Sequence, residues 1–232
     1  MTKLEELVIS KLRWFYPKNN NCEELFNTLE EIPEEERLTK NSKTLKLENH
    51  GNTVTYDSPY EKKVLEDLDQ CSFIKQIKTQ SLIIPFKAKL GNKIHKYYPD
   101  IQLLTDNNEM IIVEVKSYKG MVTKKNIHKQ EVLNDYCKEH KYGYAIVDKN
   151  WYSFEDLKNE IVSDEIIKKF IEFVDEKGKV TFSECKEFRK KYRISDKKIC
   201  FIIWKKRKKN LKCHKVKKIY TIFSKKRKKR TW

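Results

Sequence analysis

Apolar positions along the chain switch between helical spacing and short runs that are typical of strands. Helical spacing covers residues 2–15, and a polar stretch follows to about residue 55. Apolar runs rich in Ile, Leu, Val, Phe and Tyr then predict strands, and residues 105–108 form an Asp-Asn turn between two of them. The predicted order is strands at 73–85, 94–98, 100–104 and 110–115, a helix at 123–140 and a strand at 142–147. Helix, strands, helix and strand in this order predict an α/β fold with a mixed sheet flanked by helices.

A helix start precedes the first predicted strand. Ser58 has the character of an N-cap, Pro59 suits the first helical position, and Glu61 lies three residues after the cap. Val64, Leu65 and Leu68 would form the apolar face of this helix. Glu61 therefore has two interpretations, as a capping residue and as a candidate for chemistry.

The last third of the chain has its own pattern. Helices are predicted at 165–176 and 182–192, and Ser195 caps a third that runs to about 208. Two short strands follow within 211–223, so we expect a small winged-helix-like domain. The predicted domains are an N-terminal accessory region at 1–55, an α/β core at 56–150, the winged-helix-like domain at 164–223 and a basic tail at 224–232.

Positive charge is concentrated at the C-terminal end. The formal net charge is +17, and residues 197–232 hold 17 of the 51 Lys and Arg but no Asp or Glu. The preceding residues are balanced, with 34 charges of each sign. A basic segment of this density favours a polyanion as partner, and double-stranded DNA is the first candidate. We expect phosphate contacts from Lys205, Lys206, Arg207, Lys208, Lys209, Lys212, Lys215, Lys217 and Lys218.

Cysteines and hydropathy indicate the compartment. The six cysteines lie far apart without CxxC pairs, and charged residues rather than an apolar signal follow Met1. No apolar run approaches the length of about 20 residues that spans a bilayer. We therefore expect free thiols, no membrane partner and a cytoplasmic location in a bacterial or phage-infected cell, or a nuclear one in a eukaryotic or viral setting.

The strand at 110–115 carries the candidate chemistry. Side chains alternate along a strand, so Glu114 and Lys116 share one face while Val113 and Val115 share the other. Buried ions require compensation, and the neighbouring strand, which begins at Asp100, brings a further carboxylate. Such oxygen-rich sites suit Mg²⁺, with Mn²⁺ as a substitute. We expect Asp100, Glu114 and the backbone carbonyl of Val115 to be metal ligands, with Lys116 orienting a water or stabilising a phosphate.

Together these residues resemble a known superfamily. Pro99-Asp100, Glu114-Val115-Lys116 and the upstream Glu61 are similar to the PD-(D/E)xK nucleases, which have a restriction-endonuclease-like fold. Ser58-Pro-Tyr-Glu61, Gln80 before Ile83-Ile84-Pro85, Tyr98-Pro-Asp100, Val113-Glu-Val-Lys116 and Tyr144-Ala-Ile-Val147 resemble the TnsA-type transposon endonucleases.

The resemblance implies an active site of Glu61, Asp100, Glu114 and Lys116, with Glu61 as a further metal ligand. It implies cleavage of transposon 5′ ends beside a separate transposase subunit, and a C-terminal winged helix. Gln80 and Gln130 are auxiliary candidates, although a solvated helix face is the simpler interpretation of Gln130.

Other functions remain open from sequence alone. A restriction-type, phage or junction-resolving nuclease of the same superfamily would use the same residues, and paired cuts would favour a homodimer. A DNA-binding adaptor that kept the fold without activity is the alternative from a different class. The intact set of acids and lysine argues against it, because a structural protein gains nothing from charges buried on a sheet.

Overall fold

The computed structural model describes residues 1–33, 42–87, 94–207, 210–216 and 219–224. The chain divides into two compact units. The first consists of residues 1–117 and 129–153, and the second of residues 118–128 and 154–232. Residues 118–128 were expected to belong with the α/β core, and their place in the second unit is not apparent from the pattern of the sequence.

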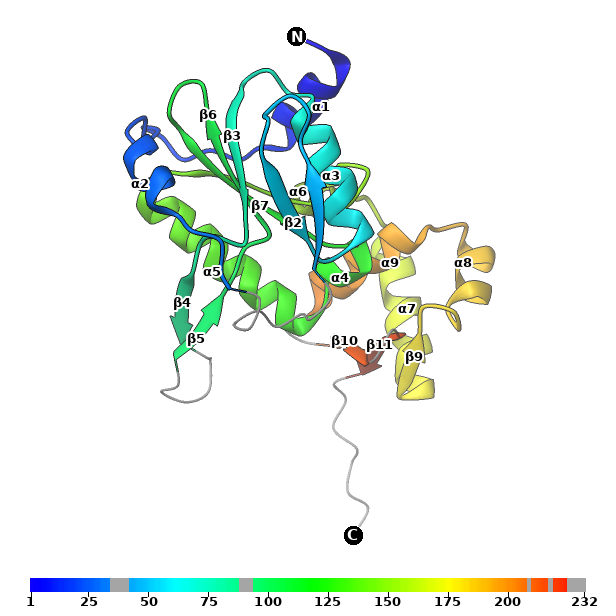
Figure 1. The fold of residues 1–232 in the computed structure, drawn as a ribbon. Helices are drawn as coiled ribbons and strands as arrows, with labels where there is room; N and C mark the ends of the chain where they lie inside the picture. The colour runs from blue at the N-terminus through cyan, green and yellow to red at the C-terminus, as the bar shows by residue number, and fades with distance from the viewer. Residues whose placement is uncertain (34–41, 88–93, 208–209, 217–218, 225–232) are drawn as a thin grey trace. The chain divides into compact units, whose positions relative to one another are not determined.

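The first unit is built on a mixed sheet. Its four strands have the order β3-β6-β7-β8, with β3-β6 and β6-β7 antiparallel and β7-β8 parallel. Figure 1 shows helices α3 and α5 flanking this sheet. The elements are α1 (Lys3–Lys11), α2 (Glu23–Thr28), β1 (Lys43–Lys46), β2 (Thr53–Tyr56), α3 (Pro59–Asp69), β3 (Ile74–Thr79), β4 (Ile84–Lys87), β5 (Ile94–Tyr97), β6 (Ile101–Thr105), β7 (Met110–Val115), α5 (Lys124–His140, whose first turn lies in the second unit) and β8 (Gly143–Val147).

This arrangement confirms the predicted mixed α/β architecture, which is consistent with a restriction-endonuclease-like fold. The predicted helix start is also present, because the Ser58 hydroxyl accepts a hydrogen bond from the backbone N–H of Glu61 and Pro59 opens α3. The predicted strand at 73–85 is interrupted. It divides into β3 and β4 at Gln80, whose φ of 47° breaks the extended backbone.

The N-terminal region is part of the first unit and contributes to its core. Val8, Leu47 and Val54 are buried in one cluster with apolar residues of α3 and the central strands. The Glu5 carboxylate accepts hydrogen bonds from the Ser72 amide at 2.6 Å and its hydroxyl at 2.7 Å. These bonds from Ser72 are the main cause that lowers the pKa of Glu5 to about 2. The polar composition of residues 17–55 concealed the packing of Leu47 and Val54.

The second unit combines helices with a small sheet of order β10-β11-β9. Helix α9 is buried through five consecutive residues, from Ile199 to Ile203, so its middle is covered on every side. The elements are α4 (Tyr118–Met121), α6 (Phe154–Lys158), α7 (Asp164–Lys177), β9 (Lys179–Thr181), α8 (Lys186–Tyr192), α9 (Asp196–Lys206), β10 (Leu211–Val216) and β11 (Ile219–Ser224). The predicted helices and strand pair are present, and the winged-helix assignment stays a prediction.

Among the described residues, none of the helices is long and apolar enough to cross a membrane.

The close contact between Trp14 and β8 gives a test of the packing. Backbone hydrogen bonds join Arg13 to Tyr144 in both directions, at 2.8 and 2.9 Å. They hold the Trp14 ring so near Gly143 that an added Cβ would lie 2.9 Å from it. We expect Gly143→Ala to lower the free energy of unfolding by about 1–3 kcal/mol through overpacking. Urea denaturation measures the loss.

A double-mutant cycle supplies the control. In a Trp14→Leu background the ring is gone, so Gly143→Ala should cost much less than it does in the parent chain. Equal costs in both backgrounds would mean that the N-terminal segment does not pack on β8.

Candidate active site

Asp100 lies directly before β6, where its carboxylate faces the end of β7. Its Oδ2 accepts a hydrogen bond of 2.7 Å from the Val115 amide and one of 3.0 Å from the Lys116 amine. The carbonyl of Asp100 accepts from the Gln80 amide at 3.1 Å. Both the backbone and the side chain of Asp100 are therefore fixed by the strands on either side.

Glu114 lies near the end of β7 and is 3% exposed. The Tyr97 hydroxyl donates a 2.7 Å hydrogen bond to its Oε2, and the Lys116 amine lies 2.8 Å from its Oε1. Val113 and Val115 belong to the hydrophobic core on the opposite face of the strand. The alternation predicted for this strand is thus confirmed, and each Glu114 oxygen has its own donor.

Lys116 connects the two carboxylates. Its amine lies within 3.0 Å of Asp100 Oδ2, Glu114 Oε1 and the Val115 carbonyl. The Lys116 amide donates to the Val147 carbonyl at 2.8 Å, so the parallel neighbour β8 holds the backbone. Burial lowers the pKa of Lys116, but Asp100 and Glu114 outweigh it and raise the pKa above its ordinary value. Lys116 is therefore a firmly charged counter-ion.

The carboxylates nevertheless exceed the charge of one lysine. Burial, the Glu114 charge and the Glu61 charge raise the pKa of Asp100 to about 7, against the opposing effect of Lys116. Asp100 thus exchanges its proton near neutral pH. An unbalanced negative charge at this position attracts a further cation.

Glu61 is placed near this group but is turned towards its own helix start. One oxygen accepts from the Ser58 hydroxyl at 2.7 Å, and the other accepts from the Asp57 amide at 2.8 Å. Burial, the largest effect, raises the pKa of Glu61, whereas the Lys116 charge lowers it. The capping interpretation of Glu61 is therefore confirmed. Its charge also acts on Asp100 and Lys116, and its role in chemistry stays a prediction.

Gln80 and Tyr97 extend the site. Gln80 is 8% exposed, and its amide nitrogen donates to Asp57 Oδ2 at 2.9 Å, which links the β3 end to the start of α3. Tyr97 is buried, and the Lys129 amine lies 4.6 Å from the centre of its ring. Sequence reasoning missed Tyr97 and Asp57. Neither follows a spacing rule, and only their proximity to Glu114 and Glu61 identifies them.

Gln130 is buried on α5, which contradicts the simpler interpretation of a solvated helix face. Its polar side chain is 5% exposed. Neighbouring α5 residues pack inwards too, because Leu133 and Cys137 are fully buried. Gln130 therefore belongs to the interior of the helix-sheet packing, and its auxiliary role stays a prediction.

The donor set suits a hard divalent cation. Asp100 and Glu114 supply carboxylate oxygens, the Val115 carbonyl adds a third, and Glu61 adds negative charge. Within the described part of the chain, no three His, Cys, Asp or Glu side chains converge as a ready metal-binding group. In this structure the Lys116 amine lies between Asp100 and Glu114, and Glu61 is engaged at its helix cap.

The predicted DNA-binding residues lie in the second unit. Lys205 is exposed, with its amine 3.7 Å from Asp164, and the Arg207 guanidinium lies 4.9 Å from the centre of the Trp204 ring. Lys206 is half-buried, whereas Lys212 and Lys215 on β10 are exposed. Lys208, Lys209, Lys217, Lys218 and the tail at 225–232 lie outside the described residues. The exposed lysines are available to a polyanion, but the middle of α9 is not.

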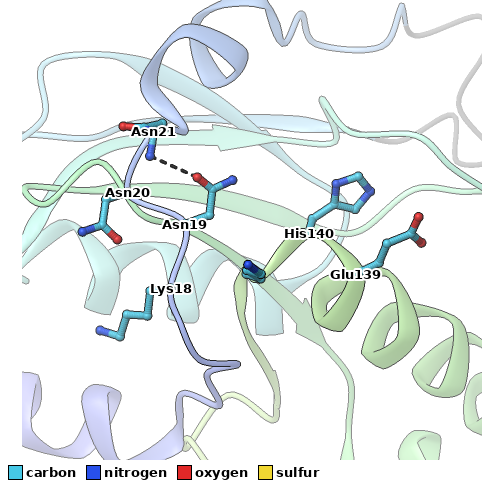
Figure 2. A pocket seen from close by; sticks show the side chains of 7 residues that line it. Lys18, Asn19, Asn20, Asn21, Glu139 and His140 are labelled. Atoms are coloured by element: carbon cyan, nitrogen blue, oxygen red, sulfur yellow. Dashed lines mark hydrogen bonds between the residues drawn. The ribbon is translucent and has the colours of Figure 1, made fainter.

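A separate hollow in the first unit has different chemistry. Figure 2 shows its lining, in which the Asn21 amide donates to Asn19 Oδ1 at 3.1 Å. The residues are Lys18, Asn19, Asn20, Asn21, Glu139, His140 and Lys141. With a single carboxylate in this set, the hollow lacks the paired acids of the Asp100 and Glu114 site.

The raised pKa of Asp100 predicts how the stability of the protein changes with pH. Its folded value of about 7 exceeds the ordinary 3.8, so the folded protein holds a proton that the unfolded chain releases. Folding is therefore penalised progressively as pH rises from about 4 to 7. Asp100→Asn removes this penalty. Its free energy of unfolding should rise relative to the parent across that window, measured by urea denaturation in EDTA at pH 5 and 8.

Asp135→Asn, at an exposed position of α5, is the matched control and should show no such trend. A difference between Asp100→Asn and the parent that is constant or falls with pH would contradict the assignment.

Comparison with known families gives a match to the segment that holds three of these site residues. The family model described as TnsA-like endonuclease N terminal matches residues 71–149. The match includes Asp100, Glu114 and Lys116, while Glu61 precedes it. A comparison with curated proteins gives no match. Residues 71–149, most of which lie in the first unit, thus resemble the N-terminal domain of the TnsA-like endonucleases, as the motifs in the sequence predict.

Proposed function

We propose that this protein is a divalent-metal-dependent DNA endonuclease that hydrolyses phosphodiester bonds. The observation that carries the proposal is the Lys116 amine shared between the Asp100 and Glu114 carboxylates, inside a segment that resembles an endonuclease domain. A buried pair of acids joined by one lysine is costly as a structural device, because replacing it with apolar residues is often neutral or stabilising. A role of these three side chains in hydrolysing a phosphodiester would account for the free-energy cost of burying them.

Asp100, Glu114 and the Val115 carbonyl would hold Mg²⁺, with Mn²⁺ as a substitute, and Glu61 would contribute directly or through a water. When bound, the ion would lower the pKa of a water and polarise the phosphate. Holding it requires the Lys116 amine to leave at least one carboxylate. That amine is then free to orient the attacking water or to stabilise the charge of the transition state.

Duplex DNA is the proposed substrate. Exposed Lys205, Lys212 and Lys215 support phosphate contacts by the second unit, whose sequence concentrates the positive charge of the chain. The order of helix, strand, two helices and two strands, with β9 completing a three-stranded sheet, supports the winged-helix assignment. Since the middle of α9 is buried, DNA contacts by this helix would come from its ends rather than from its length.

The resemblance to TnsA-type enzymes favours a role in transposition. In that role the protein would cut the 5′ ends of an element, and a separate transposase subunit would cut the 3′ ends.

Metal binding should depend on pH because of Asp100. We expect Mg²⁺ or Mn²⁺ to raise the melting temperature, and the apparent affinity to grow by up to about tenfold per pH unit between pH 6 and 7, as Asp100 loses its proton. Titration calorimetry at several pH values measures this. Asp100→Asn should bind the ion weakly, and an affinity of the parent that is independent of pH would oppose a role of Asp100 as ligand.

Cleavage tests the function itself. With Mg²⁺ or Mn²⁺, the parent should cut supercoiled and linear duplex DNA, while Asp100→Asn, Glu114→Gln and Lys116→Met should cut roughly 100- to 1000-fold more slowly. Lys138→Met, at an exposed position, is the control and should cut normally. DNA binding is followed in parallel and should be retained by every variant.

Binding without cutting by the parent would contradict an autonomous nuclease. Cutting that appears only after a transposase is added would then identify a partner-dependent subunit. An inert protein under both conditions would favour the adaptor.

A further inference from the structure

A two-stranded ribbon adjoins the proposed active site. Strands β4 and β5 pair with each other and with no strand of the four-stranded sheet among the described residues. Figure 1 shows the ribbon beyond one end of that sheet. Two-stranded ribbons are at best marginally stable by themselves in water. This one is anchored at its base, where Ile84 and Tyr97 are opposite each other and both are buried.

The two faces of the ribbon differ. Phe86 and His95 are opposite each other on the face that carries Ile84 and Tyr97, and their rings stack at 5.6 Å. The other face carries Pro85, Lys87, Ile94 and Lys96, all exposed, with Ile94 at 62%. The lysine face is exposed at all four of these positions, whereas the other face is buried at Ile84 and Tyr97 and exposed at His95.

The charge of the segment that contains the ribbon indicates which kind of partner it would bind. Residues 81–99 contain four lysines and one histidine but no Asp or Glu. Of these lysines, Lys87 and Lys96 are described, and both are exposed on the same face. Clustered lysines without acidic neighbours repel one another and favour a polyanion.

The base of the ribbon connects it to the chemistry. Tyr97 ends β5 and donates its hydroxyl hydrogen to Glu114, and Asp100 follows three residues later. The base of the ribbon therefore lies next to the carboxylates, and Tyr97 reaches Glu114 from the face opposite the lysines. A two-stranded β-ribbon also has the dimensions that the major groove of B-DNA admits.

We propose that the β4-β5 ribbon is a DNA-binding arm that enters a groove of the duplex, with Lys87 and Lys96 contacting the backbone. The inference rests on the proposed function for its substrate. It assigns duplex contacts to the first unit, in addition to those proposed for the basic C-terminal segment.

The test compares two double variants that remove the same charge. Lys87→Gln/Lys96→Gln neutralises the arm, and Lys3→Gln/Lys138→Gln neutralises two exposed lysines on α1 and α5. Binding of the full chain to a 30-base-pair duplex is measured by fluorescence anisotropy in EDTA between 50 and 200 mM salt. We expect the arm variant to lose roughly 10- to 100-fold in affinity and about 2 units of the slope of log K against log salt. The control should change little.

Lysine footprinting adds a measurement on the unmutated protein. Duplex DNA should protect the Lys87 and Lys96 amines from acetylation and leave Lys3 and Lys138 reactive. Equal labelling with and without duplex, or equal affinity of the two double variants, would overturn the arm. So would binding of an acidic protein to the arm in place of DNA.

The outcomes separate this inference from the proposed function. If the parent cuts DNA but the arm lysines are not protected, the proposed nuclease function is supported and the DNA-binding arm is contradicted. Protected arm lysines and weakened binding of the arm variant, without cutting by the parent either alone or with an added transposase, support the arm and exclude the nuclease.

Discussion

The contact of the Lys116 amine with two buried carboxylates is the constraint on which the first unit depends. Ions of this kind are stable inside a protein only when their remaining hydrogen-bonding positions are filled. The chain fills them from several elements, because Val115 donates its amide to Asp100, Tyr97 donates its hydroxyl to Glu114, and β8 holds the Lys116 backbone. The hairpin β6-β7, the ribbon and the parallel strand are therefore coupled through one ionic cluster.

The same constraint explains the irregular backbone around the cluster. At Gln80 the chain leaves β3 with a φ of 47°, a region that costs a non-glycine residue energy. In that conformation its amide reaches the Asp100 carbonyl and its side chain reaches Asp57, whose own amide donates to Glu61. The strained backbone at Gln80 thus helps to fix Asp100 before β6 and, through Asp57, Glu61 on α3. A straight continuation of the strand would lose both links.

Local rules predicted the centre of the site but not its surroundings. Alternation along one strand is enough to place Glu114 beside Lys116, and a short turn is enough to bring Asp100 to them. Tyr97 was missed because its role depends on the contact between the base of the ribbon and β7. No hydrophobic periodicity in the sequence predicts that contact. The packing of Leu47 and Val54 into the core was missed for a related reason, since long-range burial leaves no signal in a polar stretch.

The charge balance of the cluster explains why Asp100 keeps its proton and why the site favours a further cation. One lysine faces Asp100, Glu114 and the nearby Glu61, so a proton on Asp100 is retained up to about neutral pH. In the proposed function, a divalent cation would carry enough charge to replace that proton and to displace the lysine amine. Binding of the ion and release of Lys116 would then be coupled, and the amine would become available to the phosphate once the ion that lowers the pKa of the water is bound.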